Sequence, residues 1–337
     1  MKDSLFLLRQ FWLWVKQNEG QIVQILDKSW EKISSQKEVE AIKEWLQVSK
    51  SGSPQPTNAQ QSGIGYINKE LRSLWNGNFS IKFNGMFVHQ TPKVKPWSLC
   101  FNREIKGSCE IGDLITLLVF LDENDDIFYI SSLILQAKLD KGHIPSCQDK
   151  LYREEKFCFI TPKSIWQDSV IKHPQRFWDR QGLGYLYLLL SSPNPSAEIE
   201  FVKARLRAGF GKQFGLFLRN LAGVPICLYK QYRLLYRLLS WFPCLDLCLD
   251  CLLNRCLDYI QIYHSIAIWD IIREVEKSSS KKWRLTSGND PLWKIVKKFN
   301  DFDDINKNNI PEEGKEEGEK GFGMLLTTIK FRGNLEE

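Results

Sequence analysis

The sequence predicts an α/β fold, with a mixed central sheet flanked by helices. Two short apolar runs, residues 114–121 and 127–135, are rich in β-branched and aromatic residues and are typical of strands. A further apolar run at 184–190 adds a strand, and apolar residues recur at helical spacing through residues 1–50. A length of 337 residues and a hydrophobic content of 43% supply ample material for a core.

The chain begins with a helical N-terminal segment, residues 1–50. Its first helix is apolar almost all round, and we expect it to dock on the rest of the chain, with a partner or a membrane surface as the alternative. Residues 51–63 have no apolar periodicity and predict a flexible linker. A helix over 67–75 and a strand over 81–87 are then expected before the two short apolar runs.

A turn-type cluster at residues 122–126 joins the two short runs and predicts a β-hairpin. Because strand side chains alternate, Gln136 and Lys138 lie on one face at the end of the second strand. Asp113 precedes the first strand and is within reach of that face. Side chains grouped in this way hold a divalent cation through oxygen ligands and place an ammonium group beside a phosphate.

This arrangement resembles the PD-(D/E)xK nuclease superfamily, which includes restriction endonucleases and archaeal Holliday-junction resolvases. The resemblance covers a core at residues 64–195 and implies a restriction-endonuclease-like mixed sheet flanked by helices. It makes Asp113 the metal-binding acid and Lys138 the lysine of the motif. Gln136 stands at the position of the second acid, where its neutral carbonyl oxygen is a weaker ligand for a hard cation than a carboxylate.

Two further acids are candidates for the site that this resemblance implies. Glu110 reaches Asp113 if Gly112 permits a bulge or a kink, because in an unbroken strand the two carboxylates face opposite ways. Glu70 is the candidate for the acid that the superfamily often carries on the helix before its first core strand. The resemblance implies Mg²⁺ or Mn²⁺ as the cofactor, with Asp113, Glu110, Gln136 and Glu70 as its candidate ligands.

Residues 196–300 are predicted to form a helical basic region, since there is no acid between Glu200 and Asp246. Aromatic residues are interleaved with the basic ones, and the last three basic residues of the set fall on one helix face. Such a surface suits backbone phosphates and unpaired bases, and a solvated basic face over an aromatic core is the equal alternative. The candidate nucleic-acid-binding residues are Lys203, Arg205, Arg207, Lys230, Arg233 and Arg237.

Four of the nine cysteines cluster at 244–256, among leucines. Three of them share a helix face, so we expect buried free thiols and not an iron–sulfur or zinc site. Residues 301–320 are acidic and interrupted by glycine and predict disorder, and residues 321–337 form a tail with a candidate edge strand. The odd cysteine count and the lack of a secretory or membrane-spanning segment predict a cytoplasmic protein.

The function that we expect from these residues is Mg²⁺-dependent hydrolysis of DNA by an endonuclease. By analogy of fold alone, such an enzyme serves restriction, phage defence or repair. The net charge of +6 permits a nucleic-acid partner, DNA more than RNA, but does not require one. One alternative is a catalytically inactive nuclease fold that binds DNA or protein, which Gln136 favours. Another is a helical scaffold whose basic region binds a partner protein or an acidic membrane surface.

Overall fold

A computed structural model of the chain describes residues 2–35, 37–47, 62–74, 77–88, 93–96, 109–139, 146–153, 156–161, 175–177, 185–191, 196–201, 206–219, 223–226, 268–269, 271–272 and 322–332. Most of the predicted linker, the cysteine cluster at 244–256 and the acidic segment 301–320 lie outside the described residues. The helices are α1 (Lys2–Gln17), α2 (Glu19–Lys28), α3 (Glu38–Trp45), α4 (Gly63–Arg72), α6 (Ser146–Arg153) and α8 (Phe210–Leu218).

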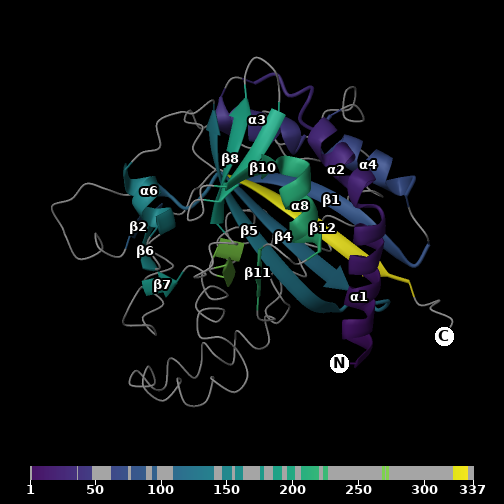
Figure 1. Ribbon diagram of the computed structural model, residues 1–337. Helices are drawn as coiled ribbons and strands as arrows, with labels where there is room; N and C mark the ends of the chain where they lie inside the picture. The colour runs from purple at the N-terminus through teal and green to yellow at the C-terminus, as the bar shows by residue number, and fades with distance from the viewer. Residues whose placement is uncertain are drawn as a thin grey trace, which may run out of the picture.

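Within the described residues, eight strands form one mixed sheet. Its order is β1 (Phe79–Val88), β12 (Phe322–Phe331), β4 (Leu114–Leu121), β5 (Ile127–Leu139), β8 (Tyr185–Ser191), β9 (Ser196–Phe201) and β10 (Leu206–Gly209), and β11 (Val224–Pro225) pairs with β5. Helices α1, α2, α4 and α8 lie together in front of this sheet (Figure 1). The expected α/β architecture, with a central sheet flanked by helices, is confirmed.

The expected hairpin is formed by β4 and β5, which are antiparallel. Asp122 closes its turn, because Oδ1 accepts the backbone N–H groups of Asn124 and Asp126, each at 2.9 Å. On its other edge β5 pairs with β8 in parallel, so that Leu135 is flanked by strands on both sides. Beyond Leu135, β5 continues beside β8 alone among the described strands, so the end of β5 that carries the predicted site residues has a strand on one side only.

The C-terminal strand β12 lies inside the sheet and not at its edge, where the sequence predicted it. It pairs antiparallel with β1 and parallel with β4. Nine of its ten residues are buried, so both faces of the strand are covered. A strand that is covered on both faces has little alternation of polar and apolar residues, and the weak alternation in the sequence was wrongly taken to mark an edge.

The helices of the N-terminal segment share one hydrophobic core with the sheet. Trp30 and Trp45 stack with their ring centroids 4.8 Å apart, and the ring of Phe210 in α8 meets both edge-on. The indole N–H of Trp45 donates to Ser29 Oγ at 2.9 Å, which satisfies a polar group that would otherwise be buried alone. The N-terminal helices are thus a layer of the fold, joined to the sheet through buried aromatic rings.

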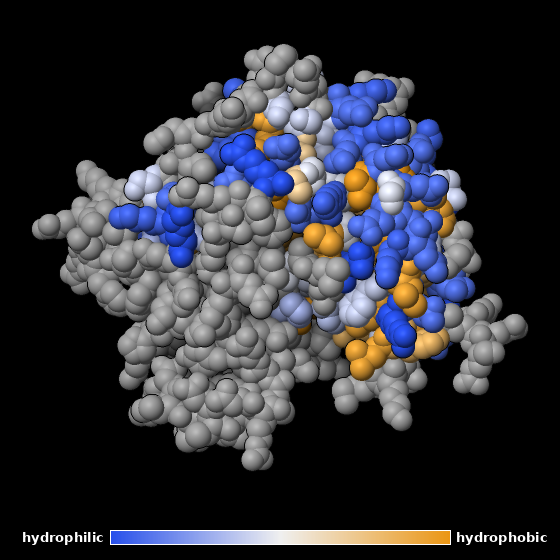
Figure 2. Space-filling view, viewed as in Figure 1, coloured by the Kyte–Doolittle hydropathy of each residue, from blue (hydrophilic) through white to orange (hydrophobic). Residues whose placement is uncertain are grey.

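One side of α1 remains exposed. Leu5, Phe6 and Leu13 are 67%, 51% and 42% exposed, and apolar residues gather over α1 in the space-filling view (Figure 2). The opposite side of the helix is buried, with Phe11 and Val15 fully covered. None of the described helices has the length and apolar character that crossing a membrane requires.

The predicted helical basic region begins with strands. β9 and β10 are antiparallel neighbours at the end of the large sheet, and α8 follows them. In β9 the apolar Ala197 and Ile199 are buried, whereas the polar residues that precede each of them, Ser196 and Glu198, are exposed. This alternation with a period of two marks a strand, and the helical prediction was wrong here because it followed the charges and not the apolar spacing.

A second, smaller sheet lies beside the large one. Within the described residues its strand order is β3 (Cys109–Glu110), β2 (Lys93–Pro96), β6 (Lys156–Thr161) and β7 (Gln175–Phe177). Helix α6 is close to it (Figure 1), in contact with β2 and β3. The chain passes from β3 in the small sheet to β4 in the large sheet through residues 111–113, so the predicted site lies where the two sheets meet.

Candidate functional site

Asp113 and Gln136 meet at the start of β4 and near the end of β5. Their neighbours Leu114 and Leu135 are paired in the antiparallel ladder, which places the two polar side chains together. Both are buried, with 4% and 1% of their surface exposed. The amide Nε2 of Gln136 donates to Asp113 Oδ2, and the backbone N–H of Ala137 donates to the same oxygen at 2.8 Å.

The backbone at Asp113 is fixed by both neighbouring strands. Its N–H donates to the carbonyl oxygen of Leu135 at 2.9 Å, and its carbonyl oxygen accepts the N–H of Gly323 at 2.7 Å. The backbone before Asp113 lies close to β5, and only glycine fits at position 112, because a Cβ atom there would lie 2.5 Å from Ile134 Cγ2. The side chain of Asp113 is therefore aimed by the strands and not by a mobile loop.

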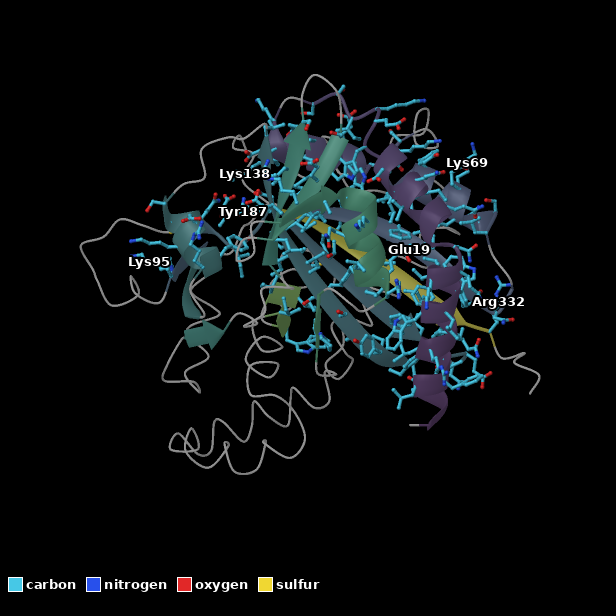
Figure 3. The ribbon with its side chains drawn as sticks, viewed as in Figure 1. Glu19, Lys69, Lys95, Lys138, Tyr187 and Arg332 are labelled. Carbon is cyan, nitrogen blue, oxygen red and sulfur yellow. The ribbon has the colours of Figure 1, made fainter. Side chains whose placement is uncertain are left out.

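Lys138 is buried in the same part of β5, and its partner comes from a distant helix. Its Nζ lies 3.2 Å from Oε2 of Glu38, in the first turn of α3. The other carboxylate oxygen of Glu38 accepts the backbone N–H of Leu139, also at 3.2 Å. Glu38 thus holds both the lysine and the strand end. Figure 3 shows Lys138 and Tyr187 at the end of the large sheet on the side of α6.

Glu38 was not among the acids predicted from the sequence, whereas Glu70 was. Glu70 lies near the end of α4 and forms an ion pair with its neighbour Lys69 at 3.8 Å. The charges that act on Asp113 are those of Lys138, Glu110 and Glu38. The acid-rich first turn of α3 is the signal in the sequence that marks Glu38, although α3 is not the helix next to the first strand.

Glu110 belongs to a different sheet from Asp113. It lies in β3, which pairs with β2 of the small sheet, and the chain bends through Ile111 and Gly112 before β4 begins. The carboxylate of Glu110 is nevertheless close enough to raise the pKa of Asp113. The bend between β3 and β4 thus leaves the carboxylates of Glu110 and Asp113 near each other. In one unbroken strand the two side chains would face opposite ways.

The carboxyl group of Asp113 titrates near neutral pH. Its pKa is raised from 3.8 to about 7, chiefly by burial and to a smaller extent by the negative charges of Glu110 and Glu38. The Lys138 ammonium and the N–H of Ala137 lower it and oppose the burial. A pKa of this size is unusual for an aspartate and is typical of functional sites.

Three oxygen atoms, one each from β5, β8 and α6, are buried and have no hydrogen-bond partner among the described residues: Gln136 Oε1, Tyr187 Oη and Gln148 Oε1. Tyr187 is the ladder partner of Gln136 in β8, and its ring lies 5.3 Å from that of Tyr152 in α6. Gln148 belongs to the same helix α6. A buried polar atom without a partner costs about 1–3 kcal/mol, and other such atoms lie elsewhere among the described residues, for example Ser131 Oγ and Thr327 Oγ1.

The remaining candidate residues are described only in part. Among the residues that the structure describes, no three His, Cys, Asp or Glu side chains are placed to hold a metal ion together. Arg207 in β10 is exposed and pairs with Glu200 of β9 at 2.6 Å. The other candidate nucleic-acid-binding residues lie outside the described residues, namely Lys203, Arg205, Lys230, Arg233 and Arg237.

The acids that the basic region lacks in sequence are supplied in part by α2. Arg219 pairs with Glu19 at 3.2 Å, and Asp27 Oδ1 accepts the N–H of Gly211 at 2.6 Å at the start of α8. One of the region's cations is thus neutralised within the fold.

Comparisons with protein-family models, with curated proteins and with solved structures give no significant match to this chain.

Proposed function

We propose that the chain is a Mg²⁺-dependent nuclease that hydrolyses DNA phosphodiester bonds, with Asp113, Gln136 and Lys138 at its active site. The observation that carries the proposal is the junction of Asp113 with Gln136 at the buried ends of two paired strands. Lys138 is two residues further along β5, and its charge acts on Asp113. A carboxylate, an amide oxygen and an ammonium group are therefore available at one place, as metal-assisted phosphodiester hydrolysis requires.

The donor atoms suit a small, hard cation. Gln136 Oε1 is a buried oxygen without a hydrogen-bond partner among the described residues, and the Asp113 carboxylate adjoins the same amide. Mg²⁺ takes only one or two protein carboxylates and keeps waters or substrate phosphates as its other ligands. When bound, the cation polarises the phosphate and lowers the pKa of a ligand water. A Mg²⁺ ion would therefore be held by Asp113 and Gln136, and Glu110 would supply a second negative charge nearby.

Gln136 must change its orientation to act as a ligand. Its amide nitrogen, and not its oxygen, faces the Asp113 carboxylate. A turn of the amide by about 180° exchanges the two atoms and brings Oε1 beside the carboxylate. The Ala137 N–H still supports Asp113 Oδ2 after this turn, because it belongs to the backbone. The site thereby has a closed form, in which Gln136 caps Asp113, and a cation-holding form.

The charged neighbours have separate tasks in this proposal. Asp113 binds the cation only as a carboxylate, and its pKa of about 7 means that binding at neutral pH releases a proton. Lys138 orients the attacking water and offsets the charge that develops on the phosphate. Glu38 is a positioning residue, since it holds the Lys138 ammonium from outside the strand.

The nucleic-acid surface is proposed from the charge pattern of the sequence. Eight basic residues and no acid lie between Glu200 and Asp246, and such a run suits the phosphates of a DNA backbone. A role in restriction, phage defence or repair is an analogy with the nucleases that the motif resembles.

A second candidate is a catalytically inactive nuclease-like module that binds DNA or protein. It is favoured by the way the polar groups satisfy one another: Gln136 caps Asp113, and Glu38 neutralises Lys138. The described residues also include no group of three acidic, histidine or cysteine ligands. In this case the buried charges would specify the fold and not a reaction.

Cleavage assays separate the two candidates. Labelled duplex, junction and single-stranded DNA are incubated with the protein in Mg²⁺ or Mn²⁺. Asp113→Ala and Lys138→Ala should each lower cleavage at least about 100-fold, while Asp149→Ala, on the exposed side of α6, leaves it unchanged. Gln136→Glu restores a charged ligand and should keep or increase cation affinity. If the wild type cleaves none of the substrates and Gln136→Glu confers no cleavage, the binding module is the correct function.

A further inference from the structure

Two cysteines meet beside the candidate site. Cys109 lies in β3 and Cys147 in the first turn of α6, and their Sγ atoms are 2.7 Å apart. Cys109 is buried, whereas Cys147 is partly exposed. A disulfide bond has a length of about 2.05 Å, so the two sulfur atoms need to approach by less than about 1 Å to form one.

The backbone around the pair is already held in place. Tyr152, one and a half turns along α6 from Cys147, donates its hydroxyl to the carbonyl oxygen of Ile111 at 2.7 Å. Ile111 is two residues after Cys109 and two residues before Asp113. Helix α6 therefore touches the chain that leads to the site at two points, a tyrosine hydrogen bond and a pair of sulfur atoms.

We propose that Cys109 and Cys147 form a reversible disulfide on exposure to a peroxide, and that this bond fastens α6 to the strand segment that leads to Asp113. Formation of the bond is independent of the proposed nuclease activity. Only its consequence rests on that activity: a fastened α6 holds the side of the site from which Tyr152 and Gln148 approach, so the oxidised protein should cleave DNA more slowly.

The chemistry follows from the unequal exposure of the two thiols. The Cys147 thiolate, which is the accessible one, attacks the peroxide; the O–O bond breaks, a sulfenic acid forms and one water leaves. The Cys109 sulfur then attacks the sulfenic sulfur; the S–O bond breaks, the S–S bond forms and the Cys109 proton leaves in a second water. Two thiols lose two electrons in total, and hydrogen peroxide gains them. A dithiol reductant reverses the bond.

The order of the two steps agrees with the surroundings of Cys109. Cys109 is buried, whereas Cys147 is partly exposed. A buried thiol is shielded from an oxidant in solution, so the exposed thiol reacts first. Once Cys147 is a sulfenic acid, Cys109 is the nearest sulfur to it among the described residues.

Peptide mapping of the full-length protein tests the bond itself. The native protein is treated with hydrogen peroxide, remaining thiols are alkylated, and the digest with trypsin is analysed without reduction. Peptide 107–138 should be joined to peptide 142–150, with a loss of two hydrogens, about 2 Da, and dithiothreitol should separate the two. Cys147→Ser should abolish the joined peptide and leave Cys109 reduced, whereas Cys158→Ser, in β6 of the same small sheet, should leave the joined peptide intact.

A thermal readout accompanies the mapping. The bond closes a loop between residues 38 positions apart, so oxidation should raise the Tm of the wild type by roughly 5 °C and leave that of Cys147→Ser unchanged. The proposal is overturned if peroxide oxidises other cysteines while 107–138 and 142–150 stay separate, or if Cys109 and Cys147 pair equally with several other cysteines. A joined peptide without any change in DNA cleavage would keep the disulfide and reject only its consequence.

Discussion

Lys138 Nζ and Glu38 Oε2 lie 3.2 Å apart, although a hundred positions separate the two residues in the sequence. The pair links the first turn of α3 to the end of β5, next to Asp113. The lysine side chain is 8% exposed and the glutamate side chain 32%, so the ion pair is largely removed from water. The charge state of the candidate site therefore depends on the packing of the N-terminal helices against the sheet.

Asp113 makes the stability of the protein depend on pH. Its folded-state pKa, about 7, is above its ordinary value of 3.8, so folding favours the protonated form. This contribution is fully present below about pH 4 and is lost as the pH rises through about 7. Asp113→Asn imitates the protonated carboxyl, so it should be as stable as the wild type at about pH 3, more stable by roughly 1.6 kcal/mol at pH 5, and more stable by up to roughly 4 kcal/mol at pH 8.

Urea denaturation at several pH values, with EDTA present, measures this difference. Asp125→Asn is the matched control, because Asp125 is partly exposed and pairs with Lys330 at the surface. The control should follow the wild type at every pH. Parallel curves for Asp113→Asn and the wild type between pH 5 and pH 8 would show that the carboxyl group has an ordinary pKa.

Glu38→Gln should destabilise the protein, because it leaves the Lys138 ammonium buried without its partner. We expect a loss of about 1–3 kcal/mol in the free energy of unfolding, since removal of one member of a buried pair is costly and Glu38 is partly exposed. Glu38→Gln combined with Lys138→Met should recover most of this loss. Asp149→Asn in α6, whose partner Arg153 lies at 2.8 Å in an exposed ion pair, should cost less than about 1 kcal/mol. Equal effects of Glu38→Gln and Asp149→Asn would refute the special role of Glu38.

Gly112→Ala should destabilise the protein by about 1–3 kcal/mol, because its Cβ atom would collide with the side chain of Ile134 in β5. Gly20→Ala in α2 is the comparison: a Cβ atom there has no neighbour within 4 Å. Alanine in a helix is preferred over glycine, so Gly20→Ala should stabilise by up to about 1 kcal/mol. Thermal melts of both variants measure the difference. A tolerated Gly112→Ala would contradict the close contact between Gly112 and β5.

Two buried threonines in the large sheet should respond oppositely to replacement by valine. Thr116 Oγ1 donates to the carbonyl oxygen of Leu133 at 2.7 Å, whereas Thr327 Oγ1 has no hydrogen-bond partner among the described residues. Thr116→Val should therefore destabilise by about 1 kcal/mol, and Thr327→Val should be neutral or stabilising. Chemical denaturation of the two variants measures both changes. A marked loss with Thr327→Val would mean that its hydroxyl has a partner after all.

The local parts of the fold could be predicted from the sequence, and the non-local parts could not. The hairpin follows from two apolar runs and a turn cluster, which are contiguous in the chain. The insertion of β12 between β1 and β4 joins Phe322–Phe331 to strands some 200 residues earlier, and no local pattern encodes that pairing. For the same reason Asp113, Gln136 and Lys138 could be grouped from the spacing within one hairpin, whereas Glu38 could not.

The most direct test of the cation site at Asp113 is an anomalous difference map from crystals soaked in Mn²⁺ at pH 8, where the carboxyl group is ionised. We expect one peak per chain, within about 2.5 Å of an Asp113 carboxylate oxygen, with Gln136 Oε1 turned towards it. Asp113→Asn crystals, soaked in the same way, should have no peak there. An empty map at Asp113 in the wild type at millimolar Mn²⁺, or an equal peak in Asp113→Asn, would contradict the proposed metal-dependent nuclease.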